Sequence, residues 1–356
     1  LREAARRTKG DPAWSEVRGV VRDAAGAPLP GALVHVTGGA GYLTRDVADD
    51  AGNYRVHVPP GETVTMFPQK RGYPKSEGVP VAPGTSALDL DMAPNGFIRV
   101  TATVDGTATP LPVRIQVIPT VLEPQTPSAF GTPDEENERL HLEFAMTGDA
   151  TLAVPPGEHR VVVSHGYEFE IHDETVTVGD GETVTIAAPL VHSIDTAGAL
   201  STDFHIHTVY STDASDPVDL KVRSIVAEGV EIACASEHEW IIDYQPYFEQ
   251  YGVTDWAFRL PSLELTTISW GHFGVVPLLP LPGEPNNGAI DWVGKSPKEV
   301  FAAVDARPEQ PALIVNHPSL SQPIQAYFTA AELDKTTGTS DHPLWDDNFD
   351  AIEVFN

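Results

Sequence analysis

The hydrophobic and polar positions before about residue 200 follow the alternating pattern of half-buried strands. Tyr54, Val56 and Val58 alternate with polar residues, a turn signal at residues 50–53 precedes them, and Pro-Pro-Gly follows them. Short strands between such turns are typical of antiparallel sandwiches. A short repeat, Val-Pro-Pro-Gly-Glu, occurs at residues 58–62 and again at 154–158. The pattern therefore predicts two β-sandwiches in tandem.

After Ser201, apolar runs alternate with helical segments. Strands are expected at residues 204–207, 230–235, 312–315 and 351–355, and helices at 217–228 and 300–306. Ser296 and Glu299 form a capping box before the second helix, and Thr329 with Glu332 has the same spacing. This alternation predicts a parallel α/β domain, and a barrel is the form whose chemistry lies at the carboxyl ends of its strands.

Composition narrows the class of protein. The 356 residues are too many for one ordinary domain, and the lack of a long apolar run argues against a membrane-spanning helix. The 51 acidic residues outnumber the 22 basic ones, so nucleic acid is not expected as a partner. The single cysteine, Cys234, excludes an intrachain disulfide, and its apolar strand predicts a buried, inert thiol.

Four domains or segments are expected from these changes of pattern. Residues 1–14 are interpreted as a leader or helical segment, 15–93 as the first sandwich and 94–195 as the second. An acidic, Pro-rich insertion is expected at 119–138. Residues 196–356 are the α/β domain.

Six of the 13 histidines lie after Ser201, and five of them, His205, His207, His238, His272 and His317, are expected just after a predicted strand. His205 and His207 are two positions apart in a strand, so both can reach one ion. Glu264 lies within an apolar run, where a carboxylate is costly unless it is paired or on a metal. Any one such residue could be structural, but together they predict a metal site built from His205, His207, His238, Glu264, His272 and His317. Beside His238, Glu237 and Glu239 either orient its ring or face solvent.

The first sandwich resembles a known family. The stretches from Gly19 to Ala32 and from Asp49 to Gly61 are similar to G-x-V-x-D-x-x-G-x-P-L-P-G-A and D-x-x-G-x-Y-x-V-x-V-P-P-G of the carboxypeptidase regulatory-like domain. The resemblance implies a prealbumin-like sandwich with an accessory or adhesion role and no catalysis.

The C-terminal part resembles another family. D-x-H-x-H at 203–207, S-E-H at 236–238, a later S-x-E, the pair Gly271-His272, N-H-P at 316–318 and I-E-V-x-N at 352–356 are similar to motifs of the PHP (polymerase and histidinol phosphatase) superfamily, in its carbaryl-hydrolase-like (CehA/McbA-type) branch. The resemblance covers roughly residues 150–356. It implies a distorted (β/α)7 barrel that holds two or three Mn, Fe or Zn ions.

The resemblance also implies a ligand for each ion. His205 and His207 would bind the first ion, and Glu264 would bridge it to a second ion held by His272 and His317. A third ion would lie on Asp213 and His238, with Asp213 alternatively capping the helix at Pro217. Asp203 would support the ligands from outside.

The sequence departs from the family at its end. The family closes its site with D-x-H after I-E-V-x-N, whereas this chain stops at Asn356, and Asp341-His342 lies too early to replace that motif. The barrel is therefore expected to be truncated at its C-terminal end, with its first ion short of a carboxylate.

The expected function is that of a metal-dependent hydrolase, because bridged ions would supply hydroxide near neutral pH. The resemblance favours a phosphoesterase, with carbamate or carboxylic ester hydrolysis as an alternative; Arg259 and Lys221 are the nearest candidates to bind phosphate. The other alternative is a non-catalytic surface or binding protein with a degenerate barrel. An extracytoplasmic location, a small ester or phosphoester substrate, and cell-surface or carbohydrate contact through the sandwiches are expected.

Overall fold

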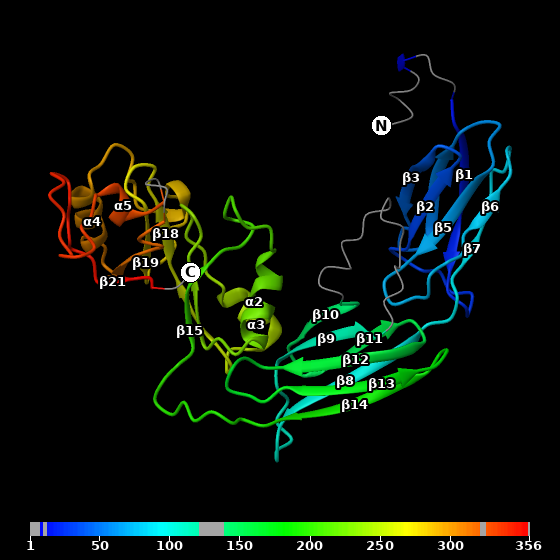
Figure 1. Ribbon diagram of the computed structural model, residues 1–356, viewed down its shortest axis with the longest axis horizontal. Coiled ribbons are helices and arrows are strands. Elements are labelled where there is room, and N and C mark those ends of the chain that lie inside the picture. The colour runs from blue at the N-terminus through cyan, green and yellow to red at the C-terminus, as the bar shows by residue number, and fades with distance from the viewer. Residues whose placement is uncertain (1–7, 10–12, 121–138, 321–324, 355–356) are drawn as a thin grey trace. The chain divides into compact units, whose positions relative to one another are not determined.

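A computed structural model describes residues 8–9, 13–120, 139–320 and 325–354 of the chain (Figure 1). The chain forms two compact units, of which the first comprises Leu1–Ser164 and Ile171–Val191, and the second comprises His165–Glu170 and His192–Asn356. Most of the expected leader, and residues 121–138 of the expected insertion, lie outside the described residues.

The first unit begins with a two-sheet sandwich. One sheet has the order β4-β1-β7, built from β1 (Ser15–Arg22), β4 (Asn53–Val58) and β7 (Leu90–Asp91). The other has the order β3-β2-β5-β6, built from β2 (Leu33–Gly38), β3 (Gly41–Val47), β5 (Val64–Gln69) and β6 (Val79–Val81). Alternate residues of the strands, such as Val17, Val34 and Met66, are fully buried and pack in one core. The predicted alternation at Tyr54, Val56 and Val58 is confirmed, since all three are buried on β4.

The rest of the first unit is a second pair of sheets. One has the order β11-β8-β14, built from β8 (Gly96–Val104), β11 (Asp149–Val154) and β14 (Thr183–Leu190). The other has the order β10-β9-β12-β13, built from β9 (Val113–Pro119), β10 (His141–Ala145), β12 (Gly157–Ser164) and β13 (His172–Val178). Both copies of the repeat follow a strand, β4 in one sandwich and β11 in the other. Gly61 in the first copy has a φ of +76°, which a residue with a side chain rarely adopts.

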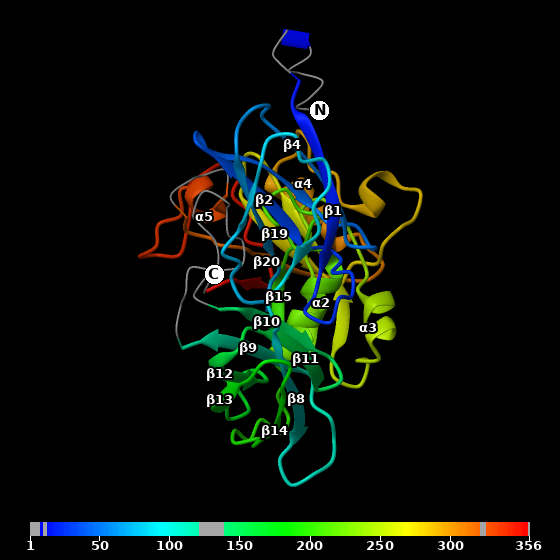
Figure 2. The same ribbon diagram turned by 90° about the vertical axis from the view of Figure 1, so that its right-hand side faces the viewer.

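The second unit holds two sheets with helices beside them. Strands β15 (Thr202–Ile206), β16 (Ile232–Ala235) and β17 (Phe258–Pro261) form a parallel sheet, and helices α2 (Val218–Ala227) and α3 (Gln245–Tyr251) lie next to each other (Figures 1 and 2). Strands β18 (Leu263–Thr266), β19 (His272–Val276), β20 (Ala312–Val315) and β21 (Ala351–Ile352) form the other sheet in that order. The remaining helices are η3 (Pro285–Gly288), α4 (Pro297–Asp305) and α5 (Tyr327–Ala330).

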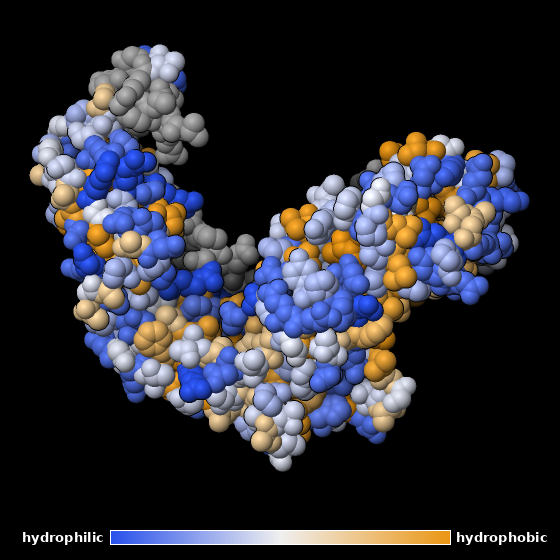
Figure 3. Space-filling view, turned by 180° about the vertical axis from the view of Figure 1, so that it is seen from behind, coloured by the Kyte–Doolittle hydropathy of each residue, from blue (hydrophilic) through white to orange (hydrophobic). Residues whose placement is uncertain are grey.

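A single core joins the second sheet to its helices. Val300, Phe301 and Val304 of α4 pack with Tyr327 of α5 against buried residues of β18, β19 and β20. The polar face of α4 is left to solvent, so the helix is amphipathic as its sequence requires. On the outside of the molecule, hydrophobic residues lie in small groups among hydrophilic ones on the face seen in Figure 3.

The prediction of a distorted (β/α)7 barrel after residue 200 is wrong. Strands β18, β19 and β20 are antiparallel neighbours, and in the described part of the chain the two sheets do not close on each other. A parallel pair needs a crossover of a dozen or more residues, whereas Thr266 and His272 are joined by a short turn. Gly271 in that turn has a φ of +83°, and Thr267 donates its hydroxyl hydrogen to the Gly271 carbonyl. The turn therefore makes a hairpin.

Candidate functional site

A buried carboxylate in the second unit lies among five histidine rings. Glu264, on β18, has no exposed surface. Its Oε1 lies 3.2 Å from Nε2 of His205, 3.2 Å from Nε2 of His317 and 3.4 Å from Nδ1 of His272. Its Oε2 lies 3.2 Å from Nε2 of His207 and 3.0 Å from Nδ1 of His238. We call these five rings and Glu264 the histidine cluster.

The ends of four strands bring the cluster together. His205 and His207 lie two positions apart at the end of β15 and can share one face. His238 follows β16 and forms an isolated parallel bridge with Glu264. The β18–β19 hairpin pairs Thr266 with His272. His317 follows β20 and has a φ of +28°.

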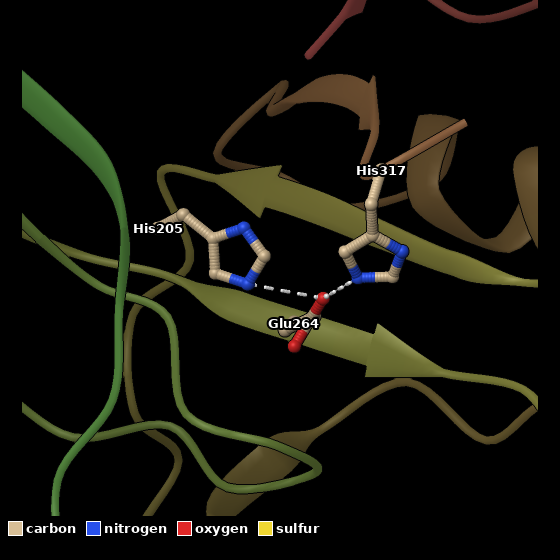
Figure 4. A group of neighbouring side chains, drawn as sticks. All are labelled: His205, Glu264 and His317. Carbon is tan, nitrogen blue, oxygen red and sulfur yellow. Dashed lines mark hydrogen bonds and ion pairs between the residues drawn. The ribbon is translucent and has the colours of Figure 1, made fainter. Parts of the chain in front are cut away.

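The nitrogen and oxygen atoms form two groups that share Glu264. In one group, His205, Glu264 and His317 offer ligand atoms that all lie within 4.8 Å of one another, and in the other His207, His238 and Glu264 do the same. Figure 4 shows Glu264 between the rings of His205 and His317. In these groups His205 lies with His317, and His207 with His238, whereas the family resemblance placed His205 and His207 on one ion; Nε2 of His205 and Nε2 of His207 are also only 3.0 Å apart.

Other side chains hold the rings from outside. Nδ1 of His205 lies 2.9 Å from Oε1 of Glu353, and Nδ1 of His207 lies 3.0 Å from Oγ of Ser211. Ser211 in turn donates to Oε2 of Glu237, at 2.6 Å. Asn316 donates from Nδ2 to Oε1 of Glu264, at 2.9 Å.

Three acidic residues named by the sequence analysis lie at the edge of the cluster. Asp213, with a side chain 57% exposed, is 3.1 Å from Nε2 of His238, the nitrogen of the ring opposite to the one near Glu264. Asp203 is exposed and accepts a hydrogen bond from the backbone of His205. Glu239 accepts one from the backbone of Thr266, at 2.6 Å. None of the three belongs to either group of possible ligands among the described residues.

The charges within the cluster depend on these contacts. Burial raises the pKa of Glu264, but hydrogen bonds from four histidines outweigh it and hold that pKa well below its usual range. Burial lowers the pKa of His205, whereas its hydrogen bonds with Glu264 and Glu353 raise it to about 10. Without another cation, the ring of His205 is therefore the group that balances the buried carboxylate.

The basic residues proposed to bind phosphate lie elsewhere. Arg259 is paired with Asp243 at 3.1 Å, and Lys221 with Asp216 at 2.9 Å. His342 packs edge-on against Trp270, with the ring centroids 5.3 Å apart, and so is outside the cluster. Neither basic side chain supports a phosphate site.

Glu353, Ser211 and Glu237 are the residues whose contacts the sequence analysis did not foresee. Glu353 stands in the I-E-V-x-N stretch but received no role, and Glu237 was left open between orienting a ring and facing solvent. The structure places Glu237 in the interior with no exposed surface. The sequence did contain a signal for Glu237, because this carboxylate stands between apolar strand residues and His238. Cys234 is buried as predicted, and burial raises the pKa of its thiol to about 12.

Comparisons with known proteins match one part of the chain to a family. Residues 16–93 match the carboxypeptidase regulatory-like domain. No curated protein matches the chain. Among the described residues, no helix is both long enough and apolar enough to cross a membrane.

The solved structures that the chain matches include two pilins. The Bacillus anthracis TIE protein is 14% identical over 51% of this chain and 35% of its own, with a TM-score of 0.22. A streptococcal ancillary pilin is 13% identical over 51% of this chain and 63% of its own, with a TM-score of 0.28. The shaft pilin SpaA of Lactobacillus rhamnosus GG is 8% identical over 51% of this chain and 99% of its own, with a TM-score of 0.31. The chain thus spans less than two thirds of the first two proteins.

The predicted hydrolase is corrected by these findings. The barrel on which it depended does not form among the described residues, and the family match covers residues 16–93 and not the part expected to be the hydrolase. The predictions of a phosphoesterase and of a carbamate or carboxylic ester hydrolase are therefore wrong, and the ester substrate is withdrawn with them. What the sequence and the structure support together is that residues 16–93 form a carboxypeptidase regulatory-like domain.

Proposed function

We propose that this chain is a non-catalytic binding protein of the cell exterior, and that its histidine cluster holds two divalent metal ions. The observation that carries the metal site is the meeting of imidazole nitrogens beside a buried carboxylate. Nε2 of His205 and Nε2 of His207 are 3.0 Å apart. Each also lies 3.2 Å from an oxygen of Glu264.

Hydrogen bonds on the outer side of each ring define these nitrogens. Glu353 can only accept, so Nδ1 of His205 carries the hydrogen. The single hydrogen of the Ser211 hydroxyl goes to Glu237, so Ser211 accepts from Nδ1 of His207. In a neutral ring the opposite nitrogen, Nε2, then has a bare lone pair. Two such lone pairs facing each other repel, and either a proton or a metal ion between them relieves the repulsion.

The donor set favours certain metals. Five imidazoles and one carboxylate suit zinc and other transition metals better than calcium or magnesium, which prefer oxygen. Two ions have more support than three, because the described residues form two groups of possible ligands and Asp213 belongs to neither. In this proposal each oxygen of Glu264 serves one ion, with His205 and His317 on one side and His207 and His238 on the other.

The surface role draws on the first unit. Its described strands form four sheets, and sandwich domains are common in cell-surface proteins. The formal net charge of −29 disfavours contact with nucleic acid and suits a protein that holds cations. Contact with a surface or a carbohydrate through the sandwiches remains part of the proposal.

Metal analysis of the full chain tests the proposal. The purified protein is stripped with a chelator, dialysed against zinc, and its metal content measured. We expect about two zinc ions per chain, one for each group, and tighter binding of zinc than of manganese. The variant His342→Gln, which removes a histidine outside the cluster, should bind as much zinc as the wild type. Failure to bind zinc would refute the metal site, and turnover of an aryl phosphate or aryl ester by the loaded chain would refute the non-catalytic role.

A further inference from the structure

We infer that Glu353 and Ser211 are positioning residues that fix different halves of the histidine cluster. Glu353 serves the group of His205 and His317, and Ser211, held by Glu237, serves the group of His207 and His238. The inference rests on the proposed metal binding and deepens it, because it says which residues outside the ligands prepare each half of the site.

Glu353 contacts both histidines of its group. Its Oε1 accepts from Nδ1 of His205 at 2.9 Å, and its Oε2 accepts from the backbone nitrogen of His317 at 2.6 Å. Its own backbone nitrogen donates to the carbonyl of Val315, which anchors it to the end of β20. The φ of +28° at His317 lies in the region that residues with side chains rarely adopt, so this backbone needs support. One carboxylate thus orients a ring and holds a strained backbone.

Ser211 does the same for the other half. Its hydroxyl donates to Glu237 and accepts from Nδ1 of His207 at 3.0 Å and from the backbone nitrogen of His238 at 3.0 Å. The hydroxyl therefore uses its one hydrogen and both of its lone pairs. Glu237 is fully buried and also accepts from the backbone nitrogen of Thr208 at 2.9 Å. This buried carboxylate leaves the serine hydroxyl a single orientation.

Such outer hydrogen bonds decide how well a histidine binds metal. A hydrogen bond from the outer nitrogen fixes the tautomer and the direction of the ring, so the inner nitrogen presents its lone pair without rearrangement. Loss of one such partner commonly weakens metal binding by about 10- to 100-fold. Because the two outer networks described here share no residue, each should affect its own ion.

The experiment uses the full chain and two alanine variants with matched controls. Glu353→Ala and Ser211→Ala remove the positioning groups. Asp347→Ala removes an exposed acidic side chain of the same C-terminal segment, and Ser224→Ala removes a serine hydroxyl that bonds within α2. Zinc affinities are measured by competition with a chromogenic chelator. The unfolding temperature of each metal-free variant shows whether it remains folded.

We expect each positioning variant to lower the affinity for one zinc ion by about 10- to 100-fold and to leave the affinity for the other nearly unchanged. The variant that carries both Glu353→Ala and Ser211→Ala should lose affinity for both ions, and the two controls should lose affinity for neither. Glu353→Gln, which keeps an acceptor oxygen, should lose less than Glu353→Ala. Unchanged affinities in either positioning variant, or equal weakening of both ions by one of them, would overturn the inference.

A second measurement separates this inference from the proposed function. In the metal-free protein, nitrogen-15 spectra should show a protected Nδ1 hydrogen on His205 and on His207. Glu353→Ala should remove the protection at His205 alone, and Ser211→Ala at His207 alone. A wild type that binds no zinc but shows this pattern would refute the metal site and support the positioning roles. A wild type that binds two ions but lacks protected hydrogens would refute the positioning roles and support the metal site.

Discussion

The histidine cluster contains a buried charge, which must be balanced by partners. A buried carboxylate is costly unless it is paired, and Glu264 is paired on both oxygens. The surrounding rings are themselves held by Glu353, Ser211 and Asp213. Replacing one member of such an arrangement therefore affects its neighbours as well.

Glu264→Gln is expected to abolish binding of both zinc ions. Each group of possible ligands uses Glu264, and an amide offers one neutral oxygen in place of two charged ones. The affinity for each ion should fall by more than about 100-fold, because a ligand is worth at least as much as the residue that orients it. The measurement is zinc content after dialysis. Glu284→Gln, at an exposed position, is the control, and retention of two ions by Glu264→Gln would count against the shared carboxylate.

His159 is expected to make the first unit less stable in acid. It is buried, and burial lowers its pKa below the ordinary 6.5 although Nε2 donates to the carbonyl of Pro155 at 2.7 Å. Below pH 6.5 the unfolded chain takes up a proton that the folded ring resists, so the contribution to stability is full above that pH and is lost as the pH falls.

Denaturant unfolding between pH 7.5 and pH 5 measures this effect, with pH values bracketing the ordinary pKa of about 6.5. His159→Gln keeps a donor for the Pro155 carbonyl and has no ring to protonate, so the pH dependence of the unfolding free energy should become shallower. His172→Gln, on a neighbouring strand of the same sheet, should leave the slope as it is. If the unfolding free energy depends on pH equally in His159→Gln and the wild type, groups other than His159 determine that dependence.

At the scale of elements, helix α4 shows a local sequence signal that the structure follows. Glu299 accepts hydrogen bonds from the backbone nitrogen and the hydroxyl of Ser296, at 2.8 and 2.7 Å, so the predicted capping box is confirmed. Thr329 and Glu332 have the same spacing but form no such box, because Thr329 lies inside α5 and donates to the carbonyl of Leu320. Spacing alone does not decide where a helix begins.

Glu299→Ala is expected to lower the free energy of unfolding of the second unit, because it removes the side chain that accepts the hydrogen bonds of Ser296 in the capping box. The helix is short, and its Val300, Phe301 and Val304 carry core contacts that depend on its position. Denaturant unfolding followed by near-ultraviolet dichroism reports on that core. Lys298→Ala, at an exposed position in the same turn, is the control. An equal loss of unfolding free energy in both variants would show that the capping box is not the cause.

The sequence could predict elements better than their pairing. Residues 312–315 form the expected strand, and the expected helix at 217–228 is present as Val218–Ala227, because apolar runs and a proline at the start leave local signals. The direction of β19 leaves no such signal, since an apolar run reads the same whether its neighbours are parallel or antiparallel. The barrel prediction failed there. His272 was expected after a strand, whereas it begins one.

The same limit applies to the site. Types of residue at strand ends indicated which side chains could gather, but which histidine lies nearest which depends on long-range pairing. His205 and His317 lie more than a hundred residues apart and are brought together by different sheets. Ser211 had no signal at all, because a serine in a loop is ordinary until its partners are known.

At the scale of the whole molecule, the chain consists of two units with separate cores. From residue 13 onward the described elements of the first unit are strands, and the second unit carries the histidine cluster. Each core is formed by residues of its own unit, so the two units are expected to unfold in separate transitions. Ligand binding to one unit should then leave the other transition unchanged.

Zinc is therefore expected to stabilise the second unit alone. An ion that binds the folded state at 100 times its dissociation constant raises the unfolding free energy by about 2.7 kcal/mol, and removal with a chelator should reverse the gain. Calorimetric scans of the full chain with zinc and with chelator measure the shift of each transition. In Glu264→Gln neither transition should move with zinc, which separates binding at the cluster from contacts with other histidines. Equal shifts of both transitions in the wild type would mean either that the units unfold together or that zinc binds outside the cluster. Glu264→Gln distinguishes these two explanations. Its transitions would still shift with zinc if zinc binds outside the cluster, and would not shift if the units unfold together.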